Sequence, residues 1–120
     1  MRISTMSEHG LSARQLDTIA GILARHCPHL ERAALFGSRA MGNYQAHSDI
    51  DLVLYGDIEA ATVDRLWTVF HESALPYKVD VQAFHLVKYP PLKRHIETEA
   101  KTLFTQSEIQ RRANHGDAPA

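Results

Sequence analysis

Two short stretches decide how this 120-residue sequence is expected to fold and act: Gly37-Ser38-Arg39-Ala40-Met41-Gly42 and Ser48-Asp49-Ile50-Asp51-Leu52. The first follows the apolar run 33–36, a pattern that predicts a buried strand ended by a glycine turn. The second opens the strongest strand pattern of the sequence, 50–55, which is rich in branched apolar residues and ends at Gly56. A glycine turn is thus followed by two acidic residues at the start of the next strand.

A third acidic residue, Asp80, lies inside the next predicted strand, 78–84, where aspartate is unfavourable by propensity. Asp49 and Asp51 are two residues apart, so on a strand their side chains point to the same side. If the two strands pair, Asp80 approaches both of them. Three neighbouring carboxylates repel one another unless a cation neutralises them, and hard oxygen ligands select Mg²⁺ or Mn²⁺. The pattern therefore predicts a metal–nucleotide site, since Mg²⁺ commonly completes its shell with phosphates.

Each of these features also has a simpler interpretation. An acidic pair at a strand entry is typical of a solvated edge or a turn cap, and Gly37-Ser38 can be an ordinary strand-ending turn. The run 37–44 lacks the Gly-Lys-Ser/Thr of a Walker A loop, and Gly-x-Gly-x-x-Gly is absent. The combination of the turn with the acidic pair is what favours an anion held by backbone N–H groups.

The remaining patterns predict the order helix, strand, loop, strand, helix, strand, helix. Ser12 and Gln15 form a capping-box pattern before the first helix, Pro28 ends that helix, and Pro91 fits the start of the last one. Periodicity is lost from about residue 106. We therefore expect one domain over residues 1–105, of the α/β or α+β class and built on a small sheet, followed by a flexible tail over 106–120.

Composition narrows the classes of function further. A formal net charge of -1 lacks the basic footprint of a nucleic-acid-binding domain, so no nucleic-acid partner is expected. The single cysteine, Cys27, excludes an internal disulfide and fits a reducing compartment. The sequence shows neither a leader pattern at its start nor an apolar run of membrane-spanning length. We expect a cytoplasmic protein without a membrane partner.

Taken together, the run 37–42, Ser48 and the Asp-x-Asp pair resemble the signature of the DNA polymerase β nucleotidyltransferase superfamily, with Asp80 in Val79-Asp80-Val81 as its third acidic residue. With Arg39, Ala40, Gly42 and Ser48 in place, the sequence resembles the minimal nucleotidyltransferase (MNT) branch, and the stretch 90–104 is similar to its closing helix. The resemblance covers nearly the whole chain. It implies a nucleotidyltransferase fold, with a small mixed β-sheet flanked by helices, and a two-metal mechanism.

The resemblance also implies a role for each catalytic residue. Gly37 and Ser38 would hold the β- and γ-phosphates of the incoming nucleoside triphosphate, ATP or another. Asp49 and Asp51 would bind the two Mg²⁺ ions, for which Mn²⁺ could substitute. Asp80 would join the catalytic metal and help to deprotonate the acceptor hydroxyl. Attack at the α-phosphate would transfer the nucleoside monophosphate and release pyrophosphate.

Two further residues complete the expected nucleotide-binding set. Arg39 could screen phosphate charge, or it could be a solvated arginine of the turn. Ser48 belongs to the same signature, and its residue type favours a role in shaping the turn before Asp51 over direct contact with the substrate.

The resemblance implies a protein partner as well. Minimal nucleotidyltransferases of this type are commonly paired with a helical HEPN protein, and as antitoxins they bind and adenylylate the HEPN toxin. Because the expected fold uses nearly all residues up to about Phe104, the acceptor would lie on another chain, in a homo- or hetero-oligomer. Two alternatives stay open: a non-catalytic antitoxin that neutralises its partner by occlusion, and a transferase that acts on a small molecule.

Overall fold

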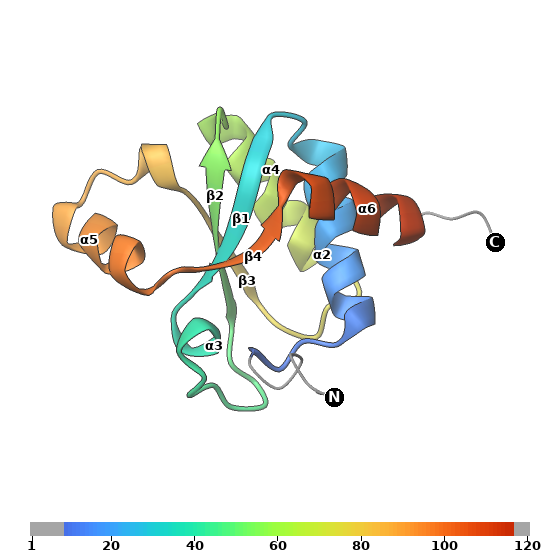
Figure 1. Cartoon of the computed structure of the whole chain (residues 1–120), viewed down its shortest axis with the longest axis horizontal. Coiled ribbons are helices and arrows are strands. Elements are labelled where there is room, and N and C mark those ends of the chain that lie inside the picture. Colours follow the sequence, from blue (N-terminus) through green and yellow to red (C-terminus); the bar gives the residue numbers. More distant parts are fainter. Residues whose placement is uncertain (1–8, 117–120) are drawn as a thin grey trace.

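A four-stranded mixed sheet is the centre of the structure, for which the computed structural model describes residues 9–116 (Figure 1). The start of the chain and residues 117–120, the end of the expected tail, lie outside the described residues. The elements are, in chain order, α2 (Ala13–His26), β1 (Leu30–Phe36), α3 (Ser38–Met41), β2 (Ile50–Gly56), α4 (Ala60–His71), β3 (Val79–Ala83), the 3-10 turn η1 (Phe84–Leu86), α5 (Pro90–Glu99), β4 (Lys101–Thr105) and α6 (Gln106–Gly116).

The strand order is β3-β2-β1-β4. Strand β1 pairs antiparallel with β2 and with β4, whereas β2 and β3 run parallel. A parallel pair needs a crossover connection, and α4 lies in the chain between its two strands. This topology brings the end of β1 and the starts of β2 and β3 to the same edge of the sheet. The expected α/β fold, a small mixed sheet flanked by helices, is confirmed.

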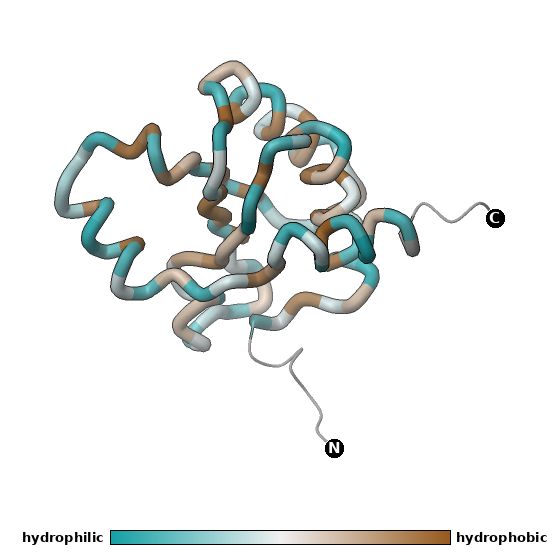
Figure 2. The backbone as a smooth tube through the Cα atoms, turned by 45° about the horizontal axis from the view of Figure 1, so that its top comes forward, coloured by the Kyte–Doolittle hydropathy of each residue, from teal (hydrophilic) through white to brown (hydrophobic). Residues whose placement is uncertain are grey.

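One face of the sheet carries the main hydrophobic core. Alternate residues of β2, Ile50, Leu52 and Leu54, are fully buried there against α2, α4 and α6. Phe70 of α4 and Ile109 of α6 belong to the same cluster. In Figure 2 the hydrophobic residues gather along the strands and the inner sides of these helices. Burial of this face is the main source of stability, because the hydrophobic effect scales with the apolar area removed from water.

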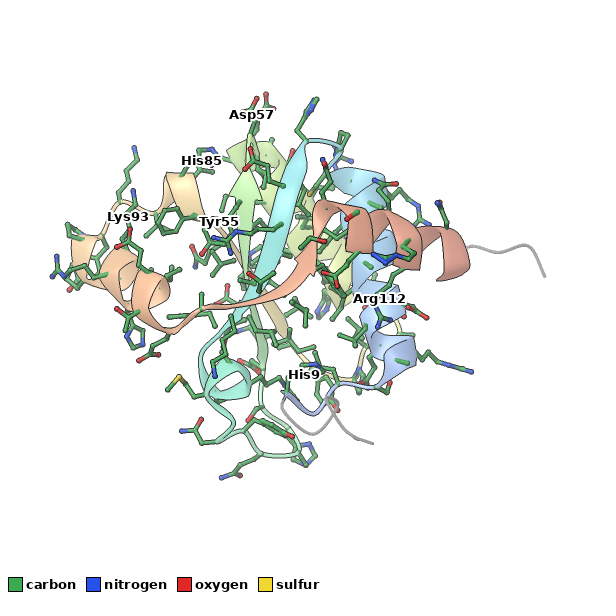
Figure 3. All side chains as sticks on the ribbon, viewed as in Figure 1. His9, Tyr55, Asp57, His85, Lys93 and Arg112 are labelled. Carbon is green, nitrogen blue, oxygen red and sulfur yellow. The ribbon has the colours of Figure 1, made fainter. Side chains whose placement is uncertain are left out.

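The opposite face is covered only in part, by α5. Val53 of β2, Val87 and Ile96 form a second, smaller core cluster between the sheet and this helix. Tyr55 extends from β2 toward α5 (Figure 3) and stacks at 5.2 Å on Phe84. Asp51, two residues before Val53 on β2, lies on this same face. No helix within residues 9–116 has the length and apolar character needed to cross a membrane.

The local signals near α2 act as the sequence predicts. Ser12 and Gln15 form the reciprocal capping box, with Gln15 N donating to Ser12 Oγ at 3.1 Å and Ser12 N donating to Gln15 Oε1 at 2.9 Å. The helix ends with its C-cap at Cys27, directly before Pro28. Helix α5 carries two prolines in its first turn, where their missing N–H groups cost nothing.

The expected flexible tail from residue 106 is wrong for the described residues, because residues 106–116 form helix α6. Ile109 and Ala113 are buried, and Arg112 Nη1 lies 2.7 Å from Asp17 Oδ1 of α2. A helix with only two buried apolar residues shows too little periodicity to be detected. Its stability comes from α2, which lies some ninety residues earlier in the chain.

The stretch 90–104 is also not one closing helix. Helix α5 stops at Glu99, and residues 101–105 form the edge strand β4, with Phe104 buried in the main core. The change of structure follows from Ala100, whose extended backbone ends the helix. The residues of β4 do not alternate between apolar and polar, so their pattern predicts no strand, and their pairing with β1 is a long-range contact.

Replacing Ile109 with alanine tests whether α6 is part of the fold. Because the side chain is 2% exposed in the main core, Ile109→Ala should lower the free energy of unfolding by about 2–4 kcal/mol, measured by urea denaturation. The matched control is Gln110→Ala, on the exposed side of the same helix, which should change it by less than about 0.5 kcal/mol. Equal, small effects of both substitutions would show that α6 does not pack in solution.

Candidate active site

The turn after β1 is built on a glycine that no other residue could replace without strain. Gly37 has φ +75° and ψ -152°, and it caps the four-residue helix α3. A Cβ atom added to Gly37 would lie 2.6 Å from Asp51 Oδ2, which is far inside van der Waals contact. The glycine therefore lets the backbone of the turn lie directly against the carboxylate of the neighbouring strand.

Two of the three predicted carboxylates lie side by side. Asp51 and Asp80 are Cα partners in the parallel pair of β2 and β3, so their side chains share one face of the sheet. Asp49 precedes Asp51 by two residues and is exposed at the entry to β2. The neighbouring residues Ile50 and Val79 point to the opposite, core-facing side. The predicted pairing of the two strands, which brings Asp80 to Asp51, is confirmed.

The electrostatics of Asp51 report how close these groups are. Burial raises the pKa of Asp51 above its usual range, and the negative charges of Asp80 and Asp49 raise it further. The positive charge of Lys78 acts in the other direction and lowers the pKa of Asp51. A divalent cation bound between the carboxylates would relieve both the desolvation of Asp51 and the like-charge repulsion.

The donor set fits such a cation in chemistry. Carboxylate oxygens are the ligands that Mg²⁺ and Mn²⁺ prefer. Within residues 9–116, no group of three or more His, Cys, Asp and Glu side chains is arranged to hold a metal ion by itself. Mg²⁺ is commonly held by one or two carboxylates together with water and substrate phosphates. The pair Asp51 and Asp80 could therefore serve as the protein's part of such a shell.

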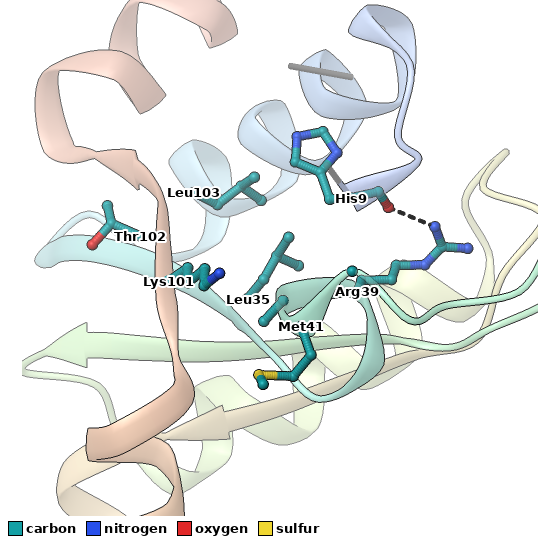
Figure 4. A pocket seen from close by; sticks show the side chains of 9 residues that line it. His9, Leu35, Arg39, Met41, Lys101, Thr102 and Leu103 are labelled. Carbon is teal, nitrogen blue, oxygen red and sulfur yellow. Dashed lines mark hydrogen bonds between the residues drawn. The ribbon is translucent and has the colours of Figure 1, made fainter. Parts of the chain in front are cut away.

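Arg39 is a buried clamp within the structure rather than a solvated arginine of the turn. It is 2% exposed, and its Nε and Nη2 donate to Ser48 O at 3.2 and 3.0 Å. Its Nη1 donates to His9 O at 2.8 Å (Figure 4). The guanidinium also packs on the rings of Tyr77 and Tyr44, 4.4 and 5.1 Å from their centroids. Arg39 thus ties α3 to the turn before β2, and its contact with phosphate stays a prediction.

Ser48 shapes the turn that delivers the acidic pair to β2. Its Oγ accepts a hydrogen bond from Gln45 N at 2.7 Å, and its own N–H donates to Gln45 O at 3.1 Å. Its carbonyl receives the two bonds from Arg39. Ser38 supplies its carbonyl to Gly42 N at 3.0 Å, which closes α3. The roles of Ser38 and Ser48 toward a nucleotide stay predictions.

Helix α5 borders the site on the face that carries the carboxylates. The ring of His95 packs edge-on against Phe36, with centroids 5.2 Å apart, and His95 Nε2 lies 3.0 Å from Glu99 Oε1. Phe36 immediately precedes Gly37 and is the β1 partner of Asp51. Residue spacing in α5 does not reveal this contact, because it depends on how the segment 84–89 returns the helix to the sheet.

Sequence reasoning also missed Lys78 and misplaced Trp67. Lys78 lies two residues before Asp80, and only the pairing of β3 with β2 brings its charge near Asp51. Trp67 and Phe70 are three residues apart, a helical spacing that is more typical of two core residues than of a base-stacking surface, yet Trp67 is 38% exposed while Phe70 is buried. Trp67 lies at the margin of the apolar face of α4, where helical spacing alone does not separate buried from exposed positions.

Alanine substitutions at three glycines test the close approach of Gly37 to Asp51. Gly37→Ala should lower the free energy of unfolding by about 1–3 kcal/mol or more, because the alanine would have an unfavourable φ and its Cβ would lie too close to Asp51 Oδ2. Gly42→Ala meets an unfavourable φ with open space around it, so it should cost less. Gly21→Ala, inside α2 with nothing nearby, should stabilise by about 0.5–1 kcal/mol. Equal effects at Gly37 and Gly42 would contradict the contact.

The raised pKa of Asp51 predicts that this residue lowers the free energy of unfolding in a pH-dependent way. Because the pKa of Asp51 is higher in the folded than in the unfolded state, this destabilisation is absent below the unfolded-state pKa and grows as the pH rises through the folded-state pKa. Without metal, Asp51→Asn should therefore have a higher Tm than the wild type at neutral pH and lose this advantage in acid. Thermal unfolding from about pH 4 to pH 8 measures it.

The control for this measurement is Asp57→Asn, an exposed position just beyond the far end of β2. It should show no comparable change with pH. Added Mg²⁺ or Mn²⁺ should raise the Tm of the wild type more than that of Asp51→Asn. A lower Tm for Asp51→Asn at every pH would contradict the prediction.

Comparisons with known proteins support the same interpretation. Three solved structures share the fold. A toxin–antitoxin with AMP-PNP is 24% identical over 86% of this chain and 84% of that chain, with a TM-score of 0.64, and a mutant of the toxin–antitoxin MntA–HpeT is 26% identical over 83% of this chain and 80% of that chain, with a TM-score of 0.60. The tri-AMPylated HEPN toxin of Shewanella oneidensis in complex with MNT antitoxin gives 24% identity over 88% of this chain and 84% of that chain, with a TM-score of 0.58. No match was found among curated protein sequences. The family model "Polymerase beta, Nucleotidyltransferase" matches residues 17–109. This match spans most of the chain, and it includes the turn and all three carboxylates, so the chain belongs to the polymerase β nucleotidyltransferase family.

Proposed function

We propose that this protein transfers AMP from ATP to a hydroxyl group on a HEPN-type partner protein and thereby acts as an antitoxin. The observation that carries the proposal is the paired Asp51 and Asp80 beside the Gly37 turn. Family membership supports nucleotidyl transfer as the reaction. Two structures with the same fold support the rest: one contains the ATP analogue AMP-PNP, and the other an AMPylated HEPN toxin.

In the proposed reaction, different residues of the chain bind the triphosphate, bind the metal ions and accept the proton of the acceptor hydroxyl. Gly37 and Ser38 would hold the β- and γ-phosphates, and Asp49, Asp51 and Asp80 would hold two divalent ions. Such ions, when bound, would supply the positive charge that neutralises the phosphate in the transition state. The acceptor oxygen forms a bond to the α-phosphorus, the bond to the bridging oxygen breaks, and pyrophosphate leaves. Asp80 accepts the proton of the acceptor hydroxyl.

The acceptor is expected on a second chain. Within residues 9–116 every strand belongs to the one sheet, and the helices pack on it or on one another. These residues therefore supply no separate module to hold an acceptor. The face that carries Asp51 is covered only by α5, which leaves the carboxylates accessible from outside. We place the reaction in the cytoplasm, where the buried Cys27, whose pKa burial raises to about 11, stays a thiol.

A second candidate is an antitoxin that neutralises its partner by binding alone. Among the described residues, no group of three or more His, Cys, Asp and Glu side chains is arranged to hold a metal ion by itself. Occlusion needs no metal, no ATP and no carboxylates, so the two functions differ in a measurable way.

The test is transfer of label from α-labelled ATP, with Mg²⁺ or Mn²⁺, to the product of the neighbouring gene. The double substitution Asp49→Ala and Asp51→Ala should lower the transfer rate by more than about a hundredfold, because it removes the charges that hold the ions. The matched control, Asp57→Ala, should leave the rate unchanged, since this exposed carboxylate lies beyond the far end of β2.

Binding of the partner is measured beside transfer, by calorimetry with the same variants. Transfer that survives the double substitution would refute the proposed site. Absence of transfer by the wild type, together with tight binding that neutralises the toxin without ATP, would establish the occlusion mechanism instead.

A further inference from the structure

A cavity of about 460 Å³ lies where α4 faces the segment that leads into β3. Its walls include the aromatic rings of Trp67 and Tyr77, the aliphatic Leu75 and Pro76, and one cation, Lys78. The volume falls within the range of about 300–1,000 Å³ that is common for small-molecule sites. His71 also lines the cavity. Aromatic walls beside the ammonium of Lys78 suit a ligand that has a planar ring and a negative charge.

Two residues of this cavity, Trp67 and Lys78, remain available to a ligand. The ring of Trp67 is 38% exposed, and Trp67 is the single tryptophan of the chain. Lys78 Nζ lies 5.7 Å from the centroid of that ring, and no carboxylate among the described residues forms an ion pair with it. The exposed face of this ring and the neighbouring ammonium are therefore both available to a ligand.

The cavity adjoins the carboxylates through β3. The backbone carbonyl of Lys78 accepts a hydrogen bond from Ile50 N at 2.9 Å, which joins the edge of the cavity to the start of β2. The positive charge of Lys78 acts on Asp51 and partly offsets the rise in its pKa. Tyr77, the other aromatic wall, packs against the buried guanidinium of Arg39, whose own helix α3 begins at the Gly37 turn. The cavity and the turn are therefore held in one framework.

The strand order then gives a direction across the site. Gly37 follows β1, Asp51 lies on β2, and Asp80 and Lys78 lie on or beside β3, the edge strand. Neighbouring strands are about 4.8 Å apart, so these groups form a row roughly 10 Å long. A triphosphate whose γ-end lies at β1 and whose α-phosphate lies between β2 and β3 would project its nucleoside toward β3, whose leading segment lines the cavity.

We propose that this cavity is the nucleoside subsite, in which the base of a purine nucleoside triphosphate stacks on Trp67 and Lys78 binds the phosphate next to the ribose. The inference rests on the proposed function, because it assumes that the Gly37 turn and the carboxylates bind a nucleotide. Stacking is tolerant of base identity, and the larger ring system of a purine covers more of the indole. The subsite should therefore prefer purine over pyrimidine nucleotides.

Trp67 itself reports on the test, because it is the only tryptophan. Titrating the full chain with Mg²⁺ and AMP-PNP should change the intrinsic fluorescence of Trp67 in a saturable way, and GTP should act similarly while CTP acts more weakly. Inorganic tripolyphosphate lacks a base, so it should bind in calorimetry with a much smaller fluorescence change. These probes separate occupation of the cavity from binding of the phosphates.

Substitutions supply an independent measurement, the Kd for AMP-PNP from calorimetry. Trp67→Ala should weaken binding about ten- to hundredfold, and Trp67→Phe, which keeps a ring, about threefold or less. Lys78→Ala should weaken it about tenfold. The matched controls are Tyr89→Ala, an aromatic ring that is 67% exposed outside the cavity, and Lys88→Ala, an exposed lysine outside it; both should leave the Kd unchanged. Circular dichroism and Tm confirm that each variant is folded.

Three results would overturn the proposal, and they differ in meaning. Normal affinity for AMP-PNP in Trp67→Ala, with silent fluorescence in the wild type, would place the nucleoside elsewhere while leaving the proposed function intact. Normal nucleotide affinity with a raised KM for the partner protein would show that the cavity holds the acceptor instead. No binding of any nucleotide by the wild type would refute the subsite and the proposed transfer together.

Discussion

The pairing of β2 with β3 in parallel register is the constraint on which the site depends. It puts Asp51 directly beside Asp80, and burial together with the charges of Asp80 and Asp49 raises the pKa of Asp51. An arrangement of like charges that is unfavourable by itself persists because the other face of the same strands is fully buried in the main core. Burial of residues such as Leu52 and Val81 stabilises the pairing of the two strands, and this pairing holds the carboxylates side by side. A bound cation would relieve the repulsion that remains.

Arg39, a residue of the signature, has a structural role at the site. Its guanidinium donates three hydrogen bonds to two backbone carbonyls, those of Ser48 and His9, and lies between the rings of Tyr44 and Tyr77. A buried guanidinium is tolerated only when its donors are paired, and here the acceptors belong to segments that would otherwise be loosely held. One side chain therefore fixes α3, the turn before β2 and the wall of the Trp67 cavity relative to one another.

The two faces of the sheet divide stability from chemistry. Helices α2, α4 and α6 bury one face, whereas α5 contributes only a small second cluster on the other. The strand ends that carry Gly37, Asp51 and Asp80 therefore remain open toward a substrate. The same openness leaves the carboxylates and the exposed ring of Trp67 uncovered by the described residues. Nucleotide, metal and partner would each complete a part of this surface.

The sequence by itself determined the fold class, the capping of α2, the strand that carries Asp51 and the choice of Asp80 as its neighbour. Each of these depends on residues close together in the chain, or on a signature whose spacing is fixed. It did not determine α6, β4, the burial of Arg39 or the exposure of Trp67. Helix α6 needs α2, β4 needs β1, and Arg39 needs a carbonyl from His9, thirty residues earlier. Contacts between distant segments leave no periodic trace in the sequence, so only the tertiary structure decided which polar groups were buried and which aromatic ring was left open.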